Sequence, residues 1–74
     1  MINDNEQRIK EKLDFFLSEK VKIHVERKDR QFWNGILVEC KNENVFMMKE
    51  NKLGIVHLFV KDIFEVDEYR EAGI

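Results

Sequence analysis

His24, His57 and Cys40 have side chains of the types that most often serve as bases, metal ligands or nucleophiles in proteins. The histidines have no nearby cysteine, so the chain contains no zinc-ligand spacing. No paired acid and base, phosphate-cradling glycine loop or nucleophile motif accompanies them. We therefore predict that the chain is not an enzyme and has no catalytic residue, no metal ion and no cofactor.

These three residues have simpler structural explanations. His24 alternates with Lys22 and Glu26, as expected on a solvated strand face. His57 is expected to face solvent or to pack within the fold. Cys40 is interpreted as a small buried hydrophobic residue.

Arg27, Lys28 and Arg30 form a local basic cluster in a polar segment that is expected to be a turn. At a hairpin tip such residues either stay solvated or contact phosphate groups. Overall, 13 Lys and Arg stand against 15 Asp and Glu, a net charge of −2. This lacks the strongly basic character of many nucleic-acid binders, but a local patch can suffice.

The elements that carry these residues follow from hydrophobic periodicity. Ile9, Leu13, Phe16 and Leu17 share one face of a helix predicted at about residues 4–18. Asp4 is its expected N-cap, with Gln7 as capping-box partner. A period of two then predicts five short strands, centred on residues 21–25, 31–40, 45–48, 55–60 and 63–66.

Glycine and hydrophobic residues in the second strand add detail. Gly35 suggests a sharp bend or a close backbone approach. Trp33 shares parity with Gly35 and Leu37 and is predicted to lie in the core. The opposite face is expected to pack under the helix or against a neighbouring subunit, and it carries Phe32, Ile36, Val38 and Cys40. Gly54 is expected at positive φ in the turn that begins at Glu50.

The composition predicts one domain, residues 1–74, with a helix, a barrel at about 20–67 and a polar tail from Asp67 to Ile74 that is mobile at its end. The 43% apolar content argues against disorder. The core of so small a domain is only marginally stable without a disulfide, a metal or a partner subunit, and one cysteine forms no internal disulfide. We therefore expect self-association to supply further buried surface.

The N-terminus resembles neither a signal nor a transit peptide, and no apolar run is long enough for a membrane helix. Together with the lone cysteine, this favours a cytoplasmic protein without membrane contact. The absence of crossover helices favours an antiparallel sheet. Five strongly bent strands close economically into a small SH3-like barrel, capped by the helix.

Trp33, Gly35 and Leu37, with Ile23 and Val25 on the preceding strand, resemble the first motif of the Sm-like family, which includes the LSm proteins and Hfq. The resemblance covers nearly the whole chain through Val66. It implies a mainly β Sm-like barrel that forms a ring of six or seven protomers, the fourth strand of one pairing with the fifth of the next. It also implies binding of single-stranded, often U-rich RNA.

The same resemblance indicates RNA-contacting positions. The family's Asn in the loop after the second strand falls on Asn42 or Asn44, and Lys41 stands where the family has Asp. The family's later Arg-Gly pair falls on Phe59 and the next residue. Phe59 offers a stacking face there, and Lys61 offers a charge. The basic hairpin residues Arg27, Lys28 and Arg30 complete the candidate set.

Two function classes remain open. The first is an oligomeric Sm-like ring that binds single-stranded RNA, as a chaperone or processing scaffold. The second is an Sm-like barrel that binds a protein partner and has lost RNA recognition, because the family's basic pair is missing. A different small barrel, of the Tudor or KOW type, would be expected to be monomeric.

Overall fold

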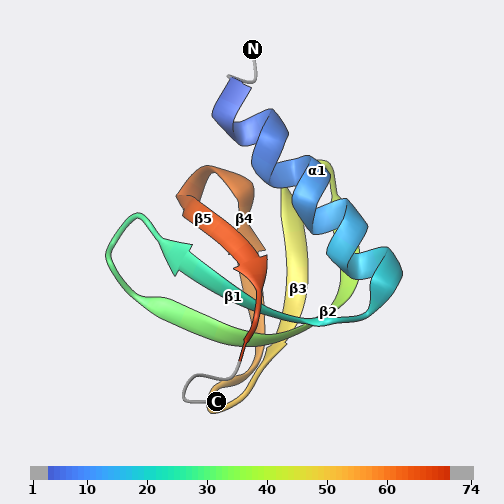
Figure 1. Ribbon diagram of the computed structural model, residues 1–74, viewed down its shortest axis with the longest axis vertical. Helices are drawn as coiled ribbons and strands as arrows, with labels where there is room; N and C mark the ends of the chain where they lie inside the picture. The colour runs from blue at the N-terminus through green and yellow to red at the C-terminus, as the bar shows by residue number, and fades with distance from the viewer. Residues whose placement is uncertain (1–3, 71–74) are drawn as a thin grey trace.

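The computed structural model describes residues 4–70, in which the N-terminal helix α1 spans Asp4–Glu19 (Figure 1). Its buried face is made of Ile9, Leu13 and Phe16, as the periodicity predicts. The helix ends where Lys20 adopts a φ of 55° and donates its backbone N–H to the Phe16 carbonyl.

The prediction that Asp4 is the N-cap is wrong, because Asp4 is already helical. Residues 1–3 lie outside the described range. Gln7 does not act as a capping partner, because its Nε2 donates to Glu11 Oε2 at 3.2 Å. This is an ordinary contact between side chains four residues apart on one helix face.

Five antiparallel strands follow, so the mainly β fold with one helix is confirmed. They are β1 (Lys22–Arg27), β2 (Phe32–Asn42), β3 (Val45–Glu50), β4 (Gly54–Phe59) and β5 (Ile63–Glu68). The sheet order is β4-β3-β2-β1-β5, so the first four strands form successive hairpins. A short 3-10 helix, η1 (Val60–Asp62), carries the chain to the opposite edge. Within residues 4–70, β4 and β5 are the two edges and do not pair with each other.

The core lies between α1 and one face of the curved sheet (Figure 1). The helix packs against β2, β5 and η1. Alternate strand residues complete the core, namely Ile23, Val25, Leu37, Phe46, Met48, Leu58, Val60, Ile63 and Val66. Trp33 is half-buried against this cluster, which confirms its predicted side of the sheet.

The opposite face of β2 is not covered by residues 4–70. Phe32, Ile36 and Val38 are exposed. Of the two expected coverings, the helix is wrong because α1 occupies the other face, and a neighbouring subunit stays a prediction. Cys40 is also exposed, contrary to prediction. That prediction depended on residue type, whereas Cys40 lies in the last part of β2, where every residue from Val38 to Asn42 is exposed.

Ionic contacts fasten α1 to β5. Lys12 Nζ lies 3.0 Å from Asp67 Oδ1, 3.3 Å from Glu65 Oε1 and 2.9 Å from the Val66 carbonyl oxygen. Arg8 Nη1 lies 3.1 Å from Glu65 Oε1. Burial alone would lower the pKa of Lys12, but hydrogen bonds and charges from Asp67 and Glu65 outweigh it and raise that pKa.

Two details of the turns and strands refine the sequence predictions. Gly54 has a φ of +80°, as expected for the turn after Glu50. The expected polar tail begins later than Asp67, because β5 continues to Glu68, and residues 71–74 lie outside the described range.

Over residues 4–70 no helix has both the length and the apolar character needed to cross a membrane.

Candidate nucleic-acid interface

Three chain connections that are far apart in sequence meet at one end of the sheet. The backbone N–H of Val60 donates to the Asn44 carbonyl at 2.9 Å, which joins η1 to the β2–β3 turn. The backbone N–H of Lys28 donates to the Asp62 carbonyl, also at 2.9 Å, which joins the β1–β2 turn to η1. Main-chain hydrogen bonds therefore bring both groups of predicted RNA-contacting residues to the same end of the molecule.

A notch of about 340 Å³ lies between two of these connections and the helix. It is lined by Glu6, Asn44, Phe59 and Lys61. We call it the loop notch. Asn44, Phe59 and Lys61 were predicted from the sequence, and all three are exposed. Phe59 ends β4 and Val45, its cross-strand neighbour, begins β3, which places the ring beside the β2–β3 turn.

Lys41 and Asn42 lie outside the lining of the loop notch. Both end β2 and are exposed. The Asn42 side-chain oxygen accepts the backbone N–H of Asn44 at 2.8 Å, so this amide shapes the turn. Of the two candidate asparagines, Asn44 is therefore the one that lines the notch.

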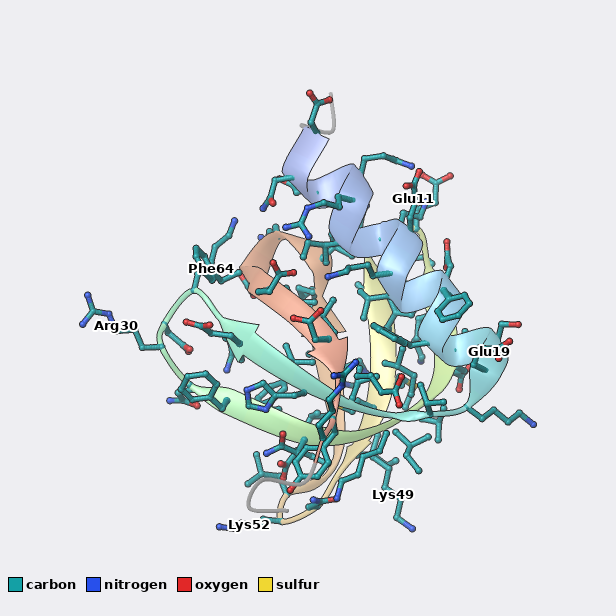
Figure 2. All side chains as sticks on the ribbon, viewed as in Figure 1. Glu11, Glu19, Arg30, Lys49, Lys52 and Phe64 are labelled. Atoms are coloured by element: carbon teal, nitrogen blue, oxygen red, sulfur yellow. The ribbon has the colours of Figure 1, made fainter. Side chains whose placement is uncertain are left out.

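The hairpin residues Arg27, Lys28 and Arg30 divide by their contacts. Arg27 stacks over the Trp33 ring at 4.4 Å and pairs with Asp29 at 3.3 Å, so its guanidinium is held against the body of the protein. Lys28 and Arg30 are exposed, and Figure 2 shows Arg30 projecting outward from the tip. Together with Phe64 and Glu26, the three basic residues line a shallow hollow of about 250 Å³.

Charges of both signs surround this end of the sheet. Lys28, Arg30 and Lys61 are accompanied by Glu6 and Asp62. Acceptors and donors therefore stand close to one aromatic face. Such a surface suits recognition of base edges together with a few phosphates, rather than binding driven by positive charge alone.

The two histidines have different surroundings. His24 is half-buried: its ring stacks on Phe32 with centroids 5.2 Å apart, and its Nδ1 lies 2.5 Å from Asn34 Oδ1. The expected solvated face is therefore wrong for His24, because neighbouring outer-face side chains engage it. His57 is exposed on β4. Among residues 4–70, no three His, Cys, Asp or Glu side chains gather in a way that could hold a metal ion.

Sequence analysis missed Glu6 and Phe64 as neighbours of the candidate residues. Glu6 is one acidic residue in a mixed-charge helix, and nothing in its spacing tells which end of the sheet it reaches. Phe64 shares parity with buried Val66, but the register between β1 and β5 shifts at Glu26 and Arg27, which leaves Phe64 exposed and outside the paired positions. Comparison with protein-family models, with curated proteins and with solved structures gives no match to this chain.

Proposed function

We propose that this chain is an Sm-like ring protein that binds single-stranded RNA at the end of the sheet where the three connections meet. The observation that carries the proposal is the pair of backbone hydrogen bonds, Val60 to Asn44 and Lys28 to Asp62. They present an aromatic face, an amide and basic groups together, which are the side chains that single-stranded RNA requires.

Each residue then has a distinct role. Phe59 stacks on a base, and the Asn44 amide hydrogen-bonds to a base edge. Lys61 contacts a phosphate, and Lys28 and Arg30 extend the phosphate path toward the hairpin tip. Arg27 and Asn42 keep the hairpin and the turn in shape through Trp33 and the Asn44 backbone. Lys41 adds positive charge at the end of β2.

The open sheet supports self-association. Strands β4 and β5 are edges, and an edge strand presents unpaired backbone groups to any strand of suitable shape. Exposed Ile55 lies on β4, and exposed Phe64 lies on β5. Pairing of β4 with β5 of a neighbour would bury these side chains, continue the sheet around a ring and complete the barrel-like Sm architecture.

The native mass tests the ring directly. We expect light scattering behind a sizing column to give six or seven times 9.0 kDa, about 54 or 63 kDa. A mass of 9.0 kDa would contradict the ring, and with it the repeated binding surface that a ring provides.

RNA binding is tested with labelled oligouridine and oligoadenosine at low and moderate salt. We expect Phe59→Ala to weaken binding about tenfold, because loss of one stacked base costs about 1–3 kcal/mol. Phe15→Ala is the matched control, since Phe15 is 60% exposed on α1 against 43% for Phe59 and lies outside the loop notch. It should bind as the parent does.

Because Phe59 lies on edge strand β4, the mass of each variant is measured before its affinity. If neither oligonucleotide binds at micromolar protein, the proposed function fails. Equal losses in Phe59→Ala and Phe15→Ala would remove the loop notch from the binding surface.

A second candidate function is supported by the uncovered outer face of the sheet. Ile36 and Val38 are exposed on β2, and Ile55 is exposed on β4, which is separated from β2 by β3. Exposed apolar patches are typical of protein–protein contacts. A monomeric mass together with no RNA binding would favour an Sm-like interaction module over the ring.

A further inference from the structure

We infer that the loop notch selects guanine over uracil, an inference that rests on the proposed function. Of the four residues that line the notch, Glu6 is the one that sequence analysis did not foresee. It lies in the first turn of α1, and the helix packs against η1, which carries Lys61. A carboxylate is thus placed beside the aromatic face proposed to hold a base.

Phe59 and Asn44 set no preference against a base with donors. An aromatic face such as that of Phe59 accepts any base, because every base has a π-face. The Asn44 amide carries both donors and an acceptor, so it adapts to either kind of edge. Lys61 contacts a phosphate in the proposed function, and Glu6, when ionised, offers only acceptors. Glu6 therefore decides which base edges are repelled.

Uracil and guanine differ in the donors and acceptors on their hydrogen-bonding edges. Uracil presents one N–H between two carbonyl oxygens, and both oxygens face repulsion from a carboxylate. Guanine presents an N–H and an amino group side by side, next to one carbonyl oxygen. The two donors match Glu6, and the carbonyl oxygen can accept a hydrogen bond from the Asn44 amide. An ionised carboxylate has about four acceptor positions, so Glu6 can accept from a base while it keeps a contact within the chain.

The test compares labelled oligouridine with an alternating uridine–guanosine oligomer of the same length, by fluorescence anisotropy on the native assembly. We expect the guanosine-containing oligomer to bind about tenfold more tightly, in the range of discrimination that a two-point base contact provides. In Glu6→Gln the ratio of the two affinities should fall below about threefold. The main reason is that an amide can donate to uracil, so oligouridine then binds better.

Glu11→Gln is the matched control. It removes the same charge from the same helix, at an exposed residue outside the notch that accepts a hydrogen bond from Gln7. Its ratio should equal that of the parent chain, which separates base selection from a general gain in affinity on loss of negative charge.

Two results overturn the inference while leaving the proposed function intact: oligouridine bound as tightly as the guanosine-containing oligomer, or a ratio that Glu6→Gln leaves unchanged. Binding of neither oligomer overturns both the inference and the proposed function.

Discussion

Gly35→Ala is expected to destabilise the fold strongly. A Cβ at this position would stand 2.0 Å from the Lys49 carbonyl oxygen and 2.9 Å from the Glu50 Cα. Both are backbone atoms of β3, so no side-chain rotation relieves the overlap, and β2 must separate from β3 where the two strands pair. Overpacking costs about 1–3 kcal/mol and occasionally more. We expect a loss of at least about 3 kcal/mol, against a total of roughly 4–11 kcal/mol for a domain of this size.

Urea unfolding followed by circular dichroism measures this loss. Gly54→Ala is the matched control, because a Cβ there meets nothing within 4 Å and only the φ of +80° opposes alanine. Its expected cost is about 1 kcal/mol. Equal unfolding midpoints for the two variants would show that the close approach of β2 and β3 is not what requires glycine at position 35.

Glu50→Ala is expected to remove about 3 kcal/mol of stability, because hydrogen bonds to charged groups contribute about 1.5–3 kcal/mol each and water replaces part of them. Glu50 is 7% exposed and its carboxylate accepts three backbone N–H groups. Oε2 accepts that of Asn34 at 3.0 Å, and Oε1 accepts those of Lys52 and Leu53 at 2.7 and 3.0 Å. One side chain thus folds the β3–β4 turn and ties it to β2.

The contribution of Glu50 should also depend on pH. Hydrogen bonds from backbone N–H groups, that of Asn34 foremost, hold the pKa of Glu50 below its ordinary 4.5 against the opposing effect of burial. A carboxyl with a depressed folded-state pKa stabilises the fold above its unfolded pKa, and this stability is lost as pH falls through the folded value.

The stability gap between the parent chain and Glu50→Gln should therefore be wide at neutral pH and should narrow at acidic pH, as the pH falls below 4.5. Glu39→Gln, at an exposed position on β2, should show little gap at either pH. A gap for Glu50→Gln that stays constant would mean that the lost contacts do not depend on the ionised carboxylate.

The local pattern of apolar residues and glycines in the sequence was sufficient to predict the helix and the strands. The spacing of Ile9, Leu13 and Phe16 predicts the helix and its buried face, and Gly35 marks the close approach of two strands. The prediction for Cys40 failed because it depended on residue type alone, and the last five residues of β2 are all exposed. Residues placed by hydrophobic periodicity were therefore predicted well, and a residue placed by its type alone was not.

The candidate site was harder to predict from the sequence. Asn44, Phe59 and Lys61 were brought forward by a family resemblance, and the structure places them in one notch. Periodicity alone does not show that η1 returns to the β2–β3 turn, because that contact depends on how the whole sheet curves. The same long-range packing brings Glu6 to the notch, which is why local pattern gave no indication of its position.

The two backbone hydrogen bonds at the end of the sheet, from Lys28 to Asp62 and from Val60 to Asn44, fix the shape of this surface without using its side chains. The donors are the main-chain N–H groups of Lys28 and Val60, and the acceptors are main-chain carbonyls. Every residue except proline supplies that N–H, so proline is the one residue type that would remove the hydrogen bond at position 28 or 60. Residues 44, 59 and 61 can therefore change while the frame that aligns them persists. This end of the protein is a scaffold on which a different ligand preference can arise by a few side-chain substitutions.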